Sequence, residues 1–135
     1  MAITLTPTLT LSSAAGATGI SSDALSFSVT TGLTVVSPIV NISKITATTT
    51  GGDSIIVPSL DSPRYVYLHH TGLNAAGSSS GTDKVVVETT GDVQIMELKI
   101  NEFAFFPFYK GSADLLQLQA SANTVQVEYA FFTRG

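Results

Sequence analysis

Apolar and polar residues alternate with a period of two along most of this 135-residue chain. The first alternation places aliphatic side chains at odd positions and threonine between them: Ile3, Leu5, Leu9 and Leu11. Successive side chains of a β-strand point to opposite faces, so this pattern predicts a half-buried strand. Because Pro7 lacks a backbone N–H, we expect this strand at a sheet edge or in an extended N-terminal arm within residues 1–13.

Further alternating segments follow, separated by clusters of turn residues. They predict strands at Leu25–Thr30, in two short runs around Pro38, at "SIIVP" after Gly51 and Gly52, and then at Arg64–His70, Lys84–Thr90, Val93–Ile100, Phe103–Tyr109, Leu115–Ala120 and Val125–Phe132. No segment has sustained helical spacing, and strand-favouring residues dominate between the turns. The expected fold is therefore all-β: one antiparallel β-sandwich over residues 1–135, of jelly-roll or Greek-key type.

The composition narrows the classes of partner. Only 12% of residues are charged, and the net charge of -4 comes from scattered acids and bases, so no basic cluster exists to bind nucleic acid. The chain has no cysteine, which excludes disulfides and thiolate metal sites. Neither a secretory signal nor a membrane-spanning apolar stretch is evident, so we expect synthesis in a host cytoplasm and no membrane partner.

The segment "INEFAFFPFYKG", from Ile100 to Gly111, concentrates aromatic residues. It contains four of the seven phenylalanines of the chain. In a straight strand, Phe103 and Phe105 point to one face and Phe106 and Phe108 to the other, so both faces need burial. Pro107 cannot complete a central ladder, which predicts a sheet edge here.

We expect Phe103 and Phe105 to face the core of the domain, while a neighbouring chain covers Phe106 and Phe108, with Tyr109 at the rim. A bulge near Pro107 that turns all four rings into one core is the alternative. Ile3, Leu5 and Pro7 of the arm complete the expected protein interface. We expect the isolated protein to form an oligomer, with three as the expected number of chains.

Three motifs could carry chemistry. Gly77, Ser79 and Gly81 match the letters of a nucleophile elbow, but a strand rather than a helix is expected after them. We therefore expect the segment Thr71–Asp83 to be a flexible loop. The tripeptide "NIS" at Asn41 fits a glycosylation acceptor, which is interpreted as coincidence without an export signal.

The remaining motifs are histidines and carboxylates. His69 and His70 are adjacent in a strand, so their rings point to opposite faces and do not share a metal readily. The acids that could meet pairwise across a sheet as a glycosidase-like dyad are Glu88, Glu97, Glu102 and Glu128. Single charges on outer strand faces commonly protect sheet edges. We expect no catalytic residue, no bound metal and no cofactor.

The C-terminal half carries a resemblance. The succession "RYVYLHHTG", "DKVVVETTGDVQIMELKINEFAFFPF" and "ADLLQLQASANTVQVEYAFFTRG" resembles small virion structural proteins of tailed bacteriophages. In that group a strand of the type "YxYxxN", a turn followed by Glu-Phe and an aromatic-Pro-aromatic continuation, and a closing "EYxxF" strand recur. The resemblance covers about half the chain. Here Asn101 stands where such proteins often carry Gly, which preserves a left-handed turn, and His69 and His70 replace a polar Asn region.

The resemblance implies a virion component without enzymatic activity. The first hypothesis is a capsid decoration or cement protein, on the capsid exterior, that forms a homotrimer and clamps neighbouring major capsid protein subunits. Low charge, surplus apolar surface and an extended arm favour it. The alternatives are a structural subunit of the tail, baseplate or a fibre, and a carbohydrate-binding or hydrolytic β-sandwich.

Overall fold

The computed structural model describes residues 2–12, 26–39, 42–50, 54–57, 63–109 and 115–135, and every regular element within these ranges is a strand. The strands in chain order are β1 (Ala2–Leu5), β2 (Thr8–Ser12), β3 (Ser26–Thr30), β4 (Leu33–Ile39), β5 (Ser43–Ala47), β6 (Ser54–Val57), β7 (Arg64–His70), β8 (Val85–Thr89), β9 (Val93–Leu98), β10 (Phe103–Phe108), β11 (Leu116–Ala120) and β12 (Val125–Arg134).

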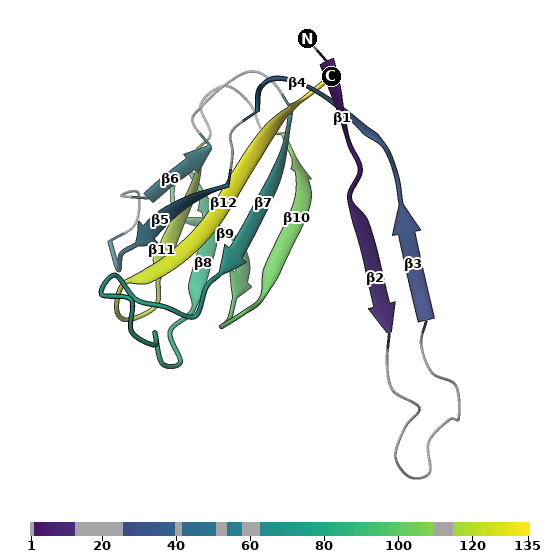
Figure 1. The fold of residues 1–135 in the computed structure, drawn as a ribbon. Helices are drawn as coiled ribbons and strands as arrows, with labels where there is room; N and C mark the ends of the chain where they lie inside the picture. Colours follow the sequence, from purple (N-terminus) through teal and green to yellow (C-terminus); the bar gives the residue numbers. More distant parts are fainter. Residues whose placement is uncertain (1, 13–25, 40–41, 51–53, 58–62, 110–114) are drawn as a thin grey trace.

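Two antiparallel sheets pack face to face (Figure 1). The six-stranded sheet has the order β1-β4-β12-β7-β10, with β5 paired to β12 beside β4. The four-stranded sheet has the order β6-β11-β8-β9. The expected all-β antiparallel sandwich is confirmed, and its finer jelly-roll or Greek-key type stays a prediction.

Alternation along the strands forms the core between the sheets. In β7 the residues at even positions are buried while those at odd positions are half-buried. The same period holds in β12 over its first residues. The core cluster consists of Ala47, Ile56, Val57, Val66, Leu68, Val85, Val87, Leu98, Leu116, Leu118, Ala120, Val125 and Val127. Burial of these aliphatic side chains is the main favourable term for folding.

The long strand β12 organises the six-stranded sheet. One side of it pairs with β7, and the other pairs first with β5 and then with β4. The register against β4 shifts between Phe132 and Thr133, whose partners are Ile39 and Val36. Pro38 lies within this irregularity, where a missing N–H costs no regular ladder bond. The two runs expected around Pro38 are thus a continuous β4 and the separate β5.

The N-terminal strands leave the sandwich as a hairpin. β1 remains in the six-stranded sheet through its pairing with β4, whereas β2 pairs with β3 alone in a two-stranded sheet. Figure 1 shows this hairpin, called the arm from here on, extending away from the two packed sheets on the side of β10. The expected placement is confirmed, since β1 lies at a sheet edge and β2 in the arm. The prediction of one half-buried strand is wrong, because the pattern is interrupted at Thr6 and Pro7 and nearly every residue of the two resulting strands is exposed.

Candidate functional site

Side chains of β10 alternate between two faces as expected, but the face that packs on the core is the opposite of the one predicted. Phe106 and Phe108 pack against the core cluster of the domain. Phe103 and Phe105 are 63% and 39% exposed. The prediction that Phe103 and Phe105 face the core is therefore wrong, and Phe106 and Phe108 are not the uncovered rings.

Cross-strand register explains the reversal. In an antiparallel pair, residues directly opposite each other share a face. Phe106 lies opposite Val66, and Ala104 lies opposite Leu68, both of which are fully buried. The register is continuous through Pro107, so the alternative of a bulge that gathers all four rings into one core is also wrong.

Pro107 lies at a free sheet edge, as expected. In the described part of the chain, β10 pairs with β7 alone. The N–H of His70 donates to the carbonyl of Glu102 at 2.9 Å, which sets the inter-strand bonds of β10 at even positions. Odd positions therefore direct their backbone groups to the free edge, and Pro107 removes a donor from that edge without disturbing the ladder.

The outer face of β7 and β10 is an aromatic surface. The rings of Tyr65 and Phe105 stack with centroids 5.9 Å apart and an interplanar angle of 12°. The guanidinium of Arg134 lies 5.3 Å from the centroid of the Tyr65 ring, within cation–π range. Burial raises the pKa of the Tyr67 phenol above its ordinary value of 10.0, and the nearby Glu128 carboxylate adds to the shift. We name this surface, formed by Tyr65, Tyr67, Phe103, Phe105 and Pro107, the outer aromatic face.

The arm has one apolar face and one hydroxyl face. Across its two strands Leu9 pairs with Val29, and Leu11 pairs with Phe27. These four side chains are between 41% and 50% exposed. The alternate positions form the hydroxyl face, where Thr8 and Thr30 share a hydrogen bond of 2.9 Å between their Oγ1 atoms. Alternation of this kind ordinarily accompanies a sheet with one covered face.

An apolar groove separates the arm from the outer aromatic face. It consists of two adjoining cavities of about 360 and 280 Å³ that share Pro7 and Phe105. The larger one is lined by residues of the arm and its links, which are Thr8, Leu9, Val29 and Thr31, and by residues of the six-stranded sheet, which are Leu33, Tyr65, Phe103 and Pro107. The smaller one is lined by Leu5, Thr6, Ile42, Tyr67, Ala130 and Phe132. We call both together the arm groove.

The remaining predicted interface residues fall in different places. Leu5 and Pro7 line the arm groove. Ile3 is 38% exposed on β1 and lines neither cavity, while Tyr109 is 66% exposed just beyond the end of β10. Contact of any of these residues with another chain stays a prediction. Sequence reasoning missed the outer residues of β7, although the alternation of "RYVYLHH" places Tyr65 and Tyr67 on one face.

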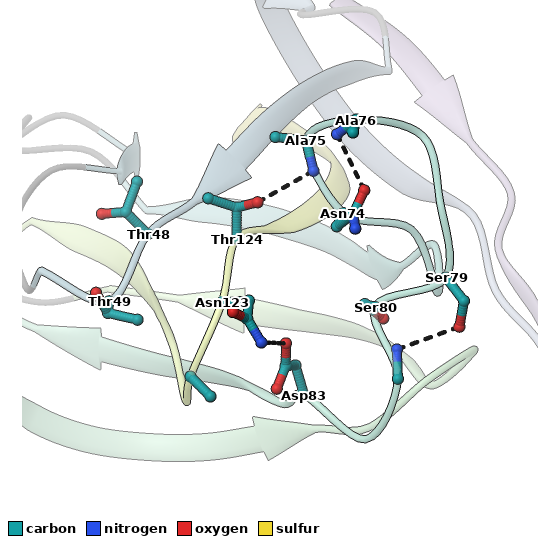
Figure 2. Close-up of a pocket in the computed structure, with 12 residues that line it drawn as sticks. Thr48, Thr49, Asn74, Ala75, Ala76, Ser79, Ser80, Asp83, Asn123 and Thr124 are labelled. Atoms are coloured by element: carbon teal, nitrogen blue, oxygen red, sulfur yellow. Dashed lines mark hydrogen bonds between the residues drawn. The ribbon is translucent and has the colours of Figure 1, made fainter.

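A separate polar cavity lies at one end of the sandwich (Figure 2). Its volume is about 600 Å³, and three segments line it: the end of β5, the loop between β7 and β8, and the turn before β12. Asp83 is 8% exposed, and one of its carboxylate oxygens accepts a hydrogen bond from Asn123 Nδ2 at 2.9 Å. Ser80 is 5% exposed, and its Oγ has no hydrogen-bond partner among the described residues. We call this cavity the end pocket.

The loop Thr71–Asp83 that forms the end pocket is held by hydrogen bonds. Asn74 Oδ1 accepts from the N–H groups of Ala76 and Ser78 at 3.0 Å each. The buried His70 ring fixes both ends of the loop, because Nδ1 accepts from Gly72 N–H and Nε2 lies 3.0 Å from the carbonyl of Asp83. Because Nδ1 accepts, Nε2 is the ring nitrogen that donates to the carbonyl of Asp83. The loop expected to be flexible is thus extensively hydrogen-bonded.

The candidate nucleophile does not have the geometry of an elbow. Ser79 forms an isolated bridge with Leu73, and its Oγ accepts a hydrogen bond from Gly81 N–H at 3.1 Å. The strand β8 follows the loop, as expected, instead of a helix. A nucleophile elbow requires a strand–turn–helix arrangement that exposes the serine beside a base.

The histidines and the four acids each have other partners. His69 lies on the outer face 3.2 Å from Glu128, and His70 points into the core, so the expected opposite orientation is confirmed. Glu88 accepts from Gln117, Glu97 pairs with Lys84, and Glu102 accepts from the Lys99 N–H. Within residues 2–12, 26–39, 42–50, 54–57, 63–109 and 115–135, no three side chains of the metal-binding types converge. Asn41 lies outside the described residues. Asn101 adopts the expected left-handed conformation, with φ of 64°.

Comparison with known protein families, with curated proteins and with solved structures finds no match. In the part of the chain that the structure describes, no helix is both long enough and apolar enough to cross a bilayer.

Proposed function

We propose that this chain is a non-enzymatic structural protein of a virion, which decorates the capsid exterior and stabilises it by binding major capsid protein subunits. The observation that carries the proposal is the arm groove, where two uncovered apolar surfaces of one chain face each other. A groove of this composition is suited to binding protein surface, because large exposed apolar patches commonly mark interaction sites.

The arm itself supports a role in assembly. A two-stranded hairpin is at best marginally stable in water unless its apolar face is covered. Leu11 and Phe27 remain 47% and 46% exposed in the single chain. Contact with other subunits would cover this surface, and binding to the folded state would raise its stability by mass action.

A decorated shell also fits the modest size of the available surface. A weak contact repeated around a closed lattice gains by multivalency, so each copy needs only a limited interface. A tail, baseplate or fibre subunit would use the same arm at lower copy number. The polar groups considered for catalysis have structural partners, which supports a binding role over an enzymatic one.

Quantitative mass spectrometry of purified particles tests this proposal. We expect hundreds of copies per particle, and density for the protein on the capsid faces in electron micrographs. A handful of copies would assign the protein to the tail, and absence from washed particles would contradict the proposal. Phe103→Ser should lower occupancy on the particle, whereas Ile95→Ser, which changes a 44% exposed side chain of β9, serves as the matched control.

A second candidate function is saccharide binding in the end pocket (Figure 2). Among the described residues, the lining offers amides and hydroxyls with a single carboxylate, Asp83, and its apolar residues are alanines. The carboxylate disfavours anions, and the lack of large apolar side chains among the described lining residues disfavours lipids, so the lining is suited to neutral polyhydroxyl ligands. The unpartnered hydroxyl of Ser80 is a group that a ligand could satisfy.

Saturation-transfer NMR with neutral mono- and disaccharides tests this second function. Ser80→Ala removes no hydrogen bond of the described chain, so it should preserve the fold while reducing saccharide binding. Ser28→Ala, on the hydroxyl face of the arm, should leave saccharide binding unchanged. The absence of transfer from every saccharide tested would reject the end pocket as a glycan site.

A further inference from the structure

The apolar face of the arm and the outer aromatic face are both largely uncovered in the single chain. We propose that the arm of each copy packs its apolar face on the outer aromatic face of another copy. This inference goes beyond the proposed function, because it concerns contact between copies and not contact with the shell.

The donor surface is the apolar face of the arm. Leu11 and Phe27 form its outermost apolar pair, and neither residue lines the groove that the arm shares with its own sheet. No charged residue occurs in β2 or β3. The apolar face can therefore be covered without burying an unpaired charge.

The acceptor surface is the outer aromatic face. Phe103 is 63% exposed, although it lies in a fully described strand directly opposite His69. The stacked pair of Tyr65 and Phe105 provides a flat apolar floor beside it. Aromatic side chains of this kind dominate the binding energy of protein interfaces.

The links of the arm favour packing between chains over packing within one chain. Only Thr6 and Pro7 join β1 to β2, and only Thr31 and Gly32 join β3 to β4. The pairing of β1 with β4 anchors both links at the sheet, and the ring of Pro7 restricts the backbone further. The arm therefore projects from its own sheet with an open groove beneath it, and short links of this kind favour exchange between copies.

The whole chain exposes more surface than a compact monomer of its mass. Its exposed area is 7781 Å², whereas a compact monomer of 14.1 kDa exposes about 6,700 Å². The difference of about 1,000 Å² accompanies an extended shape, in which the arm stands apart from the two packed sheets (Figure 1). It is of the same order as the roughly 800 Å² that each partner buries in a standard interface.

The free edge of β10 directs the contact to the face of the sheet. Pro107 lacks the donor that an added strand would need at that edge. An arm that approaches the outer aromatic face instead uses side chains alone and keeps its own β2–β3 ladder intact. Packing of one sheet on another at about 10 Å is the ordinary geometry for such a contact.

Mixed single-cysteine chains test the exchange directly, because the natural chain has no cysteine. One chain carries Leu11→Cys, and a second chain of different tag carries Phe103→Cys. Mild oxidation of the mixture should yield a disulfide-linked heterodimer, which can form only between chains. Leu11→Cys mixed with Ile95→Cys is the control, because Ile95 is similarly exposed on the other sheet.

Light scattering of the Cys-free protein at tens of micromolar provides the second measurement. We expect a mass that is a multiple of 14.1 kDa, which Phe27→Ser and Phe103→Ser each reduce to 14.1 kDa with an unchanged far-UV spectrum. Ile95→Ser should keep the multiple. A monomeric parent protein, equal loss in all three variants, or heterodimer yields no higher than the control would overturn the inference.

The two proposals fail in different ways. A monomer in solution that still occurs in hundreds of copies on particles rejects arm exchange and leaves the decoration function standing. An oligomer linked by arms in solution that is absent from particles rejects the decoration function and leaves arm exchange standing.

Discussion

The two faces of the six-stranded sheet follow the same alternation but differ in what covers them. On the inner face, Val66 and Leu68 of β7 are fully buried against the second sheet. On the outer face, Phe103 remains 63% exposed, and the arm stands off across a groove. A strand pattern therefore specifies which side chains share a face, whereas the cover for each face depends on elements distant in the sequence or in another chain.

The largest contrast is expected between two phenylalanines of β10. Phe106→Ala should lower the free energy of unfolding by about 2–4 kcal/mol, because the ring packs against the core cluster. Phe103→Ala should change it by less than about 1 kcal/mol, since the ring is largely exposed. Urea denaturation under monomeric conditions measures both. Equal losses would show that the outer face is covered within the chain.

The adjacent histidines of β7 allow the inner and outer faces to be compared at neighbouring positions of one strand. His70→Ala should cost about 1–3 kcal/mol, because it leaves the Gly72 N–H and the Asp83 carbonyl without their partner. His69→Ala should cost less than about 1 kcal/mol, since it removes a partly exposed pair with Glu128. Thermal unfolding monitored by circular dichroism compares them, and amide exchange of Thr71–Asp83 should accelerate only in His70→Ala.

The smallest effect is expected at Tyr67 on the outer face. Its raised pKa means that the neutral phenol is favoured in the folded state. The stabilisation is fully present below pH 10.0, the ordinary pKa, and is lost as the pH rises through the raised folded value. When tyrosine ionisation is followed by ultraviolet absorbance, Tyr67→Phe should remove the component that titrates at the highest pH. Removal of a component that titrates at lower pH would contradict the burial of Tyr67.

The sequence was sufficient for the sandwich and for the free edge at Pro107, because period-two alternation and a missing N–H act locally. The sequence was insufficient to decide which face of β10 packs on the core. All four phenylalanines are equally apolar, so composition alone could not decide between Phe103 with Phe105 and Phe106 with Phe108. The decision came from the pairing of Phe106 with Val66 and of Ala104 with Leu68, which joins segments separated by some forty residues. The only hint in the local sequence was Ala104, a small residue on the same face of β10 as Phe106 and Phe108.

The candidate site depended even more on distant segments. Leu5 and Pro7 were selected from the arm pattern, and the structure places both beside Phe105. The hydroxyl and apolar faces of the arm became visible only when Leu9 was paired with Val29 and Leu11 with Phe27. The end pocket was not predicted, because the loop Thr71–Asp83 has the composition of a flexible linker. Its conformation is held by hydrogen bonds to the imidazole of His70 and to the hydroxyl of Thr124.

Pro107 also has a consequence for aggregation through the free edge of β10. An exposed strand with neighbouring phenylalanines is a template on which identical strands could add without limit and form insoluble ribbons. The pyrrolidine ring interrupts that template near its end, at one of the odd positions, whose backbone groups point away from β7, so the pairing with β7 stays unbroken. Ladder growth along this edge is therefore disfavoured, while the exposed aromatic side chains of the same strand remain available for a side-chain contact.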